Sequence, residues 1–253
     1  MFLRTESFKE FLRFYPIVST LVAIHLILWM LIDLFQFGFA LDWLHAGIGL
    51  NIAISSGEYW RLVTPIFLHN GLGHAFFNSF SLVLFGPALE QMLGKTKFIV
   101  TYLFAGIIGN AATYLFNPDS YIPHLGASGA IFGIFGVYLF MVAYRKNMID
   151  QANSQIVMVI FVIGLVMTFV RPNINILGHI GGLAGGFFLA PFVLKNARPF
   201  SIWRNSRTTN QGDVSFNPNR WKKSRFPWKK ILTYLLWGGI IILVIFGLLG
   251  RMT

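Results

Sequence analysis

Long, almost uninterrupted apolar runs dominate this sequence and restrict what it can fold into. Stretches of about 18 or more apolar residues recur along the chain, and this is the length of a helix that crosses a lipid bilayer. The chain is 55% hydrophobic and only 11% charged, with more apolar surface than a soluble domain of 253 residues could bury. Closed barrels also span membranes, but their short alternating strands do not match these continuous runs. The sequence therefore predicts an all-α polytopic membrane protein.

We expect seven spanning helices. They lie at 17–36, 73–93, 98–116, 127–144, 155–171, 177–194 and 231–250. The connector 37–72 is only half apolar and contains Trp43, Tyr59 and Trp60, which are aromatic residues typical of membrane interfaces. We therefore expect it to be a partly inserted loop with short helices.

Composition divides the chain into three parts. Residues 1–195 hold the first six spans and form a predicted core domain. Residues 196–230 are rich in Asn, Ser, Arg and Lys and are interpreted as a cytoplasmic linker to the seventh span and short tail at 231–253. No small-residue cleavage site of the signal-peptide kind follows the first run, so we expect the first span to be retained.

Basic residues set the expected orientation. Seventeen of the 20 Lys and Arg residues fall on one side of the predicted spans, and the other side holds only Arg61, Arg171 and Arg251. By the positive-inside rule, the N-terminus is cytoplasmic and the C-terminus lies outside. This bias also accounts for the net charge of +11 without a nucleic-acid partner.

This orientation gathers four polar residues near the outer face. His74 and Asn78 lie in the first turns of the second span, Ser128 begins the fourth and His179 lies in the first turns of the sixth. All three spans run from outside to inside, so the four side chains share one depth. Ionisable groups within a membrane are functional candidates by default.

Ser128 and His179 could form a nucleophile and its general base. A serine hydroxyl is a weak nucleophile until a base takes its proton. A third, acidic member would orient the imidazole, but no carboxylate lies at the right level, so we predict a Ser-His dyad. Phe132 is one helical turn below Ser128 on the same face and could hold the ring by stacking. Cysteine is absent, which excludes disulfides, iron–sulfur clusters and cysteine-protease chemistry.

Acyl transfer also requires donors for the developing oxyanion. The backbone N–H of Ser128, at a helix N-terminus, is one candidate. His74 and Asn78 are the others, because their spacing of four residues puts them on one helix face. Small residues allow membrane helices to approach closely. The glycines expected to bring spans four and six together are Gly129, Gly133, Gly182 and Gly186.

Five short motifs occur in order on these predicted elements. They are Tyr59-Trp60-Arg61, the His69–Asn78 segment with His74-x-x-x-Asn78, Gly86-Pro87-Ala88-Leu89-Glu90, Gly126-Ala127-Ser128-Gly129, and His179-Ile180-Gly181-Gly182 with Gly186. Together they resemble the rhomboid family of intramembrane serine proteases over most of residues 1–195. The seventh span resembles the 6+1 arrangement with an extra C-terminal helix.

The resemblance implies a six-span core with a water-filled cavity open to the outside. It implies Ser128 as nucleophile, His179 as base, and an oxyanion hole formed by His74, Asn78 and the Ser128 amide. It also implies that the substrates are other membrane proteins, cut in or near their spans in the bilayer, and that no cofactor is needed. Some members carry tyrosine where this chain has Phe132, so stacking is retained while a hydroxyl contact is lost.

The sequence is also compatible with other functions. A catalytically silent rhomboid-like protein would bind membrane clients without cutting them. A transporter or channel would spread polar residues across the membrane depth, whereas here they lie at one end. A metal site formed by His69, His74 and His179 matches no familiar zinc spacing and includes no carboxylate.

Overall fold

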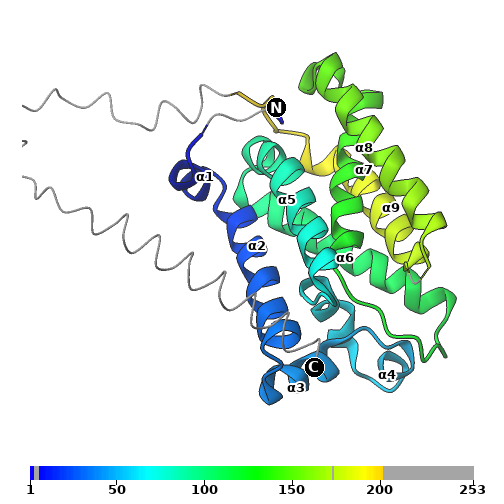
Figure 1. Ribbon diagram of the computed structural model, residues 1–253. Coiled ribbons are helices and arrows are strands. Elements are labelled where there is room, and N and C mark those ends of the chain that lie inside the picture. The colour runs from blue at the N-terminus through cyan, green and yellow to red at the C-terminus, as the bar shows by residue number, and fades with distance from the viewer. Residues whose placement is uncertain (3–5, 173, 202–253) are drawn as a thin grey trace, which may run out of the picture. The chain divides into compact units, whose positions relative to one another are not determined.

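Helices account for the regular structure of residues 1–2, 6–172 and 174–201, the part of the chain that the computed structural model describes (Figure 1). Five of them are long and apolar enough to cross a membrane, and a sixth, α7, is apolar but shorter. The first is α2 (Pro16–Trp29) with its π-helical continuation η1 (Met30–Leu34). The others are α5 (Leu72–Leu93), α6 (Lys95–Phe116), α7 (Ser128–Tyr144), α8 (Gln151–Val170) and α9 (Ile176–Val193).

These six elements confirm the predicted all-α polytopic class. Their ends agree with the first six predicted spans to within four residues. Outside the described residues lie the whole of the predicted seventh span 231–250 and most of the predicted linker 196–230.

Short helices fill the connector, as predicted. They are α3 (Gly38–Gly47), α4 (Asn51–Ser55) and the 3-10 turns η2 (Tyr59–Leu62) and η3 (Thr64–Phe67). The Trp-Arg pair holds this segment together through backbone carbonyls. The Trp60 indole N–H donates to Ala46 O (3.0 Å), and the Arg61 guanidinium donates to His45 O (2.9 Å) and Ile48 O (2.7 Å). Buried carbonyls in irregular backbone need such partners. Two further short elements are α1 (Phe8–Phe14) and η4 (Lys146–Met148).

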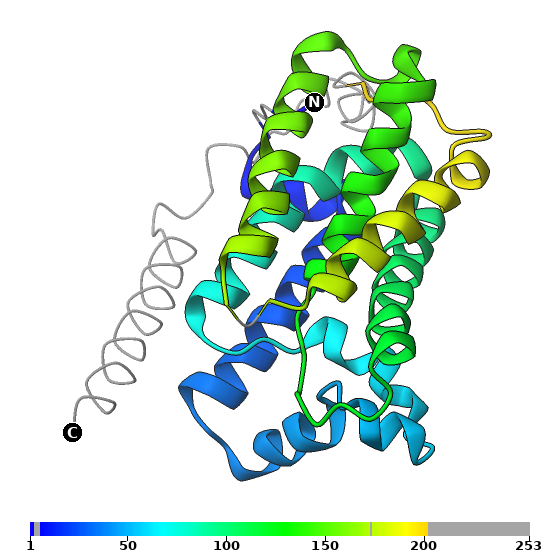
Figure 2. The same ribbon diagram turned by 90° about the vertical axis from the view of Figure 1, so that its right-hand side faces the viewer.

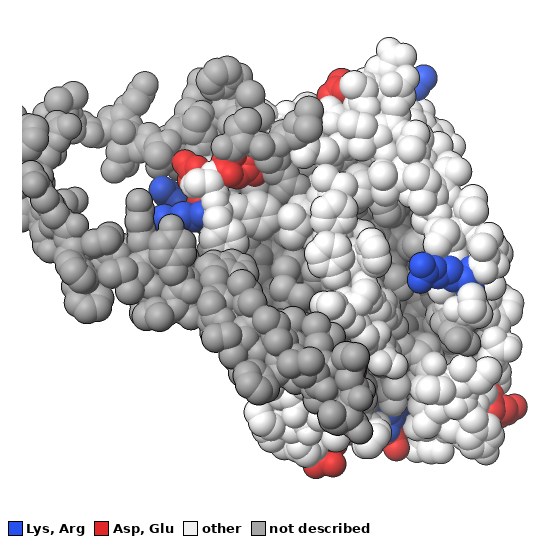
Figure 3. Space-filling view, in the orientation of Figure 1, with Lys and Arg blue, Asp and Glu red and all other residues white. Residues whose placement is uncertain are grey.

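Helix α7 lies at the centre of the six. It contacts α5, α6, α8 and α9, and most of its residues from Ala130 to Met141 are buried. Helix α8 is the opposite case, because its buried side chains are Val157, Phe161 and Thr168 while its other large apolar side chains are largely exposed. A helix with so much exposed apolar surface suits contact with lipid. Figure 3 shows a face on which most of the described surface is uncharged.

Helices α2 and α5 run antiparallel and exchange carboxylate caps. Glu90, near the C-terminal end of α5, accepts hydrogen bonds from Ile17 N (3.0 Å) and Val18 N (2.9 Å) in the first turn of α2. Asp33, at the C-terminal end of η1, accepts one from the N–H of Gly71, the residue before α5. The first N–H groups of a helix have no partner within it. Each helix therefore supplies a carboxylate acceptor for N–H groups at the N-terminal end of the other.

The loop from 117 to 127 returns along the connector before α7 begins (Figure 2). It makes an isolated two-residue bridge between Gly49 and His124, and the Asn51 side chain donates to Thr113 O (3.1 Å) and Asn117 O (2.8 Å). A Cβ on Gly49 would lie 2.4 Å from the His124 ring, so only glycine allows this approach. The loop and the connector form one supported layer at the end of the bundle that holds Ser128.

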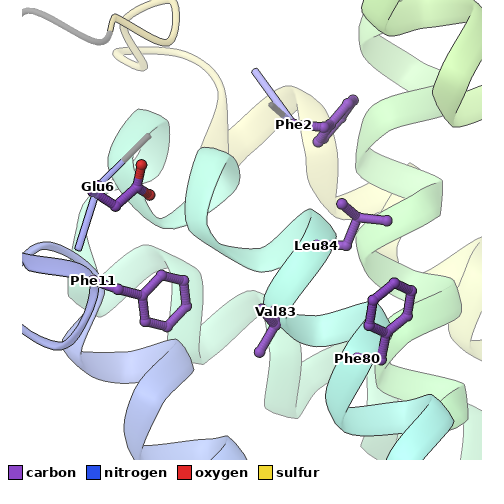
Figure 4. Close-up of a pocket in the computed structure, with 6 residues that line it drawn as sticks. All are labelled: Phe2, Glu6, Phe11, Phe80, Val83 and Leu84. Atoms are coloured by element: carbon purple, nitrogen blue, oxygen red, sulfur yellow. The ribbon is translucent and has the colours of Figure 1, made fainter. Parts of the chain in front are cut away.

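An open, mostly apolar pocket of about 300 Å³ lies between the N-terminal segment and α5 (Figure 4). Its lining residues are Phe2, Glu6, Phe11, Phe80, Val83 and Leu84. Ser128 and His179 are not among them, so this pocket is separate from the site described next.

Candidate functional site

Ser128 and His179 come together at the start of two neighbouring helices. Ser128 is the first residue of α7, and His179 lies in the first turn of α9. The Asn175 side chain fixes that turn, because its Oδ1 accepts a hydrogen bond from Gly178 N (2.9 Å). Ser128 Oγ and His179 Nε2 are 2.7 Å apart, a short hydrogen bond. His179 is 8% exposed, so most of its ring is withdrawn from solvent.

Backbone contacts between glycines set this approach. A Cβ on Gly182 would lie 2.0 Å from the carbonyl oxygen of Gly129, and a Cβ on Gly186 would lie 2.0 Å from that of Gly133. Real Cβ atoms essentially never come within 3.0 Å of such a neighbour. Helices α7 and α9 can therefore touch at two successive turns only because all four positions lack larger side chains.

Phe132 stacks on the imidazole of His179. The ring centroids are 4.3 Å apart and the planes differ by 19°. Phe132 itself is buried and packs against Phe161 of α8 (6.4 Å between centroids). The histidine ring therefore lies between an aromatic face and the Ser128 hydroxyl, in a fixed plane.

A third side chain, which the sequence did not indicate, completes the surroundings of His179. Thr168 Oγ1 lies 2.8 Å from His179 Nδ1, and the same hydroxyl donates to Gly164 O (2.8 Å) one turn earlier in α8. Thr168 is 1% exposed. The sequence pattern does not single out Thr168, because a lone threonine in an apolar span resembles one that only bonds its own helix.

His74 and Asn78 lie on the face of α5 that meets Gly126, two residues before Ser128. A Cβ on Gly126 would fall 2.5 Å from His74 Nε2 and 3.8 Å from Asn78 Nδ2. Gly126 has φ of +124°, a conformation that favours glycine. One amide hydrogen of Asn78 is already donated to His74 O (3.0 Å), which leaves a second for another acceptor.

Two more histidines extend from this region into the bundle. His69 Nε2 accepts a hydrogen bond from Ala127 N (3.4 Å), and burial holds the pKa of His69 well below its ordinary value. Its ring lies 5.1 Å from that of His74 and 4.7 Å from that of His25. His25, which shows no partner in the sequence pattern, is 3.2 Å from the Tyr102 hydroxyl. His69 therefore supports the backbone just before Ser128, and His25 packs behind it.

The alternative metal site has no geometric support among the described residues. Within 1–2, 6–172 and 174–201, no three His, Cys, Asp or Glu side chains are grouped so that they could hold a metal ion.

Comparison with known proteins identifies relatives of this chain. The family model described as "Rhomboid domain" matches residues 56–196, a range that includes Ser128 and His179. The chain is 47% identical over 190 residues to the rhomboid protein YdcA of Bacillus subtilis, covering 75% of this chain and 94% of YdcA. It is 44% identical over 140 residues to the rhomboid protease GluP of the same organism, covering 55% of this chain and 27% of GluP.

More distant relatives extend beyond bacteria. Rhomboid-like protease 1 of Toxoplasma gondii is 32% identical over 165 residues, which cover 63% of this chain and 55% of that protein. The domain match spans more than half of the chain, and the match to YdcA covers nearly all of that relative. This membrane protein therefore belongs to the rhomboid family.

Proposed function

We propose that this protein is an intramembrane serine endopeptidase that cleaves other membrane proteins in or near their spanning segments. The observation that carries the proposal is the 2.7 Å contact between Ser128 Oγ and His179 Nε2. Relatives named as rhomboid proteases support the same reaction class.

The mechanism follows from the geometry of the two side chains. His179 Nε2 takes the Ser128 proton as Oγ attacks the scissile carbonyl carbon, and the carbonyl oxygen becomes an oxyanion. His179 then gives that proton to the leaving amine, which breaks the C–N bond and leaves an acyl-enzyme. Water attacks the ester with His179 again as base, and Ser128 is regenerated with a free carboxylate product.

The oxyanion is stabilised by donors near the start of α7. The N–H of Ser128 belongs to the first turn of that helix, where amides have no helical acceptor. The second amide hydrogen of Asn78 and a ring N–H of His74 are the side-chain donors that we assign. Phe132 keeps the His179 ring in the plane that both proton transfers require. No cofactor enters any of these steps.

The short central helix explains how water reaches a site within a membrane. Helix α7 has 17 residues and is about 26 Å long at 1.5 Å per residue, less than the roughly 30 Å of a hydrocarbon core. A helix of this length leaves part of the membrane thickness unspanned, and we place Ser128 at the end where water enters. We assign the site to the outer half of the cell membrane and the N-terminus to the cytoplasm, from the distribution of basic residues. The catalytic core is residues 1–195, with a linker at 196–230 and a seventh span and outer tail at 231–253.

The test is cleavage of a single-span model substrate by the purified chain in detergent, with fluorophosphonate labelling alongside. Ser128→Ala and His179→Ala should each abolish both signals. Ser19→Ala removes a hydroxyl that donates to Tyr15 O in α2 and should change neither, so it serves as the matched control. Full activity of Ser128→Ala would overturn the mechanism. Absence of both cleavage and labelling in the unaltered protein would favour a client-binding rhomboid that does not cut.

A further inference from the structure

We propose that Thr168 is a positioning residue that holds His179 in the tautomer required of a general base. The inference rests on the proposed function, because it assigns a role toward the same histidine. The hydrogens that the three polar groups possess allow only one consistent set of bonds among them.

A threonine hydroxyl has one hydrogen and a neutral imidazole has one N–H. The Thr168 hydroxyl donates its hydrogen to Gly164 O at 2.8 Å. Its oxygen can then only accept from His179 Nδ1, at 2.8 Å, which places the ring hydrogen on Nδ1. Nε2 is left with its lone pair toward Ser128 Oγ at 2.7 Å. One unbroken donor-to-acceptor chain thus runs from the serine to a helix carbonyl.

The opposite tautomer is disfavoured by the same contacts. With its hydrogen on Nε2, the ring would offer Ser128 a donor instead of a base, and Nδ1 would face the Thr168 oxygen as a second acceptor. The hydroxyl would have to turn away from Gly164 O to relieve that contact. The bond made by one ring nitrogen therefore selects the protonation of the other.

The arrangement also serves the protonated ring. When His179 has taken the serine proton, both nitrogens are donors, and Nδ1–H still finds the same oxygen of Thr168. No group needs to rotate between the two states. Thr168 thereby supplies the orienting part of the role that an aspartate has in a Ser-His-Asp triad, without its charge.

The placement of Thr168 within α8 supports a specific role. Its buried companions in that helix are the apolar Val157 and Phe161, whereas most of the helix is exposed. Phe161 contacts Phe132, which stacks on His179. The inward face of α8 therefore contacts the histidine in two ways, directly through a hydroxyl and indirectly through the stacked ring.

Thr168→Val tests the proposal, because it removes the hydroxyl and nearly preserves the shape. Nitrogen NMR of ¹⁵N-histidine-labelled protein distinguishes Nδ1–H from Nε2–H rings, and the His179 signals among the six histidines are assigned by their loss in His179→Ala. We expect the unaltered protein to show the Nδ1–H form and Thr168→Val to show a mixture. Fluorophosphonate labelling of Ser128 should fall about ten- to a hundred-fold, the effect typical of losing a hydrogen bond to a charged group.

Two further variants separate positioning from packing. Thr168→Ser keeps the hydroxyl and should restore both the tautomer and labelling to within about three-fold, since it changes only a methyl group. Thr101→Val is the matched control, because Thr101 is also buried in a spanning helix and also donates to the carbonyl four residues earlier (Lys97 O, 2.7 Å). It should leave the His179 tautomer and the labelling rate unchanged.

The tautomer measurement also distinguishes failure of the inference from failure of the proposed function. It needs no activity and can be made in a Ser128→Ala background, where Nδ1 and Thr168 remain paired. An Nε2–H ring in the unaltered protein, or an unchanged Nδ1–H ring and labelling rate in Thr168→Val, would overturn the role of Thr168. A Thr168-dependent Nδ1–H ring in a chain that neither labels nor cleaves would support the inference and refute the protease.

Discussion

Adding one methyl group at Gly182 should separate the serine from its histidine. In Gly182→Ala the new Cβ would lie 2.0 Å from the Gly129 carbonyl oxygen, against the 3.4 Å at which ordinary contact begins, a deficit of 1.4 Å. The obstacle is backbone, so no side-chain rotation relieves it, and helices α7 and α9 must move apart. Gly129 follows Ser128 directly, and Gly182 lies one turn after His179, so the displacement acts at the level of the 2.7 Å hydrogen bond.

Two measurable losses follow from that displacement. Overpacking a dense core typically costs 1–3 kcal/mol, and a backbone obstacle belongs at the upper end, so we expect destabilisation of about 3 kcal/mol. A misplacement of about 1 Å at a reacting group can cost about a hundred-fold in rate. Thermal unfolding in detergent measures the first effect. Fluorophosphonate labelling of Ser128, at a temperature where the variant is folded, measures the second.

Gly73→Ala is the matched control, because it makes the same change in a spanning helix where a Cβ meets nothing within 4 Å. It should leave labelling unchanged and raise helix stability slightly, since alanine restricts the unfolded chain more than glycine does. If Gly182→Ala unfolded and reacted like the Gly73→Ala protein, helix contact at Gly182 would not determine the Ser128–His179 distance.

Three further perturbations probe separate parts of the structure. Glu90→Ala leaves the N–H groups of Ile17 and Val18 without their acceptor. Thermal unfolding should show that the free energy of unfolding falls by about 1–3 kcal/mol for each unsatisfied donor. An unchanged melting temperature would exclude the capping role of Glu90. Asn78→Ala should slow substrate cleavage about a hundred-fold to a thousand-fold while leaving some activity, as for loss of one of several oxyanion donors; full activity would remove Asn78 from the oxyanion hole. Burial lowers the pKa of His124 from 6.5 to about 4. Between these two pH values the unfolded chain binds a proton that the folded chain excludes. The contribution of His124 to the free energy of unfolding is therefore fully present above pH 6.5 and is lost as the pH falls from 6.5 to about 4. Because buried His69 contributes in the same direction, His124→Gln should reduce the fall in melting temperature across that range without abolishing it. An unaltered pH dependence would exclude a contribution from His124.

The positions of the six helices followed from the sequence because each apolar run is long and bounded by polar or glycine residues. Helix α7 could be placed to within one residue, because Gly126 marks the end of the preceding loop and a continuous apolar run follows Ser128. The sequence also predicts which residues share one face of a helix. Phe132 could be named as a stacking partner of His179 because it lies one turn after Ser128 on the same face. These features depend on residues that are close together in the chain.

Contacts between different helices could not be predicted from the sequence in the same way. Thr168 is eleven residues before His179, but an apolar helix that is exposed on most sides gives no periodic indication of which side faces inward. Nor did the sequence show that His25 would meet Tyr102, 77 residues later. Only the packing of the helices against one another determines such pairs.

The exchanged caps between α2 and α5 have a consequence for how the protein is assembled. Asp33 is synthesised before Gly71, so the junction at the start of α5 can close as soon as that helix enters the bilayer. The start of α2 must wait for Glu90, more than seventy residues later, and until then two of its N–H groups have no protein partner. The two caps lie at opposite ends of the antiparallel pair, and the cap near Ser128 joins the residues that are closer together in sequence. Once both caps are formed, a slip of one helical turn, about 5.4 Å, would break the two junctions together, so the caps fix the register of α2 against α5.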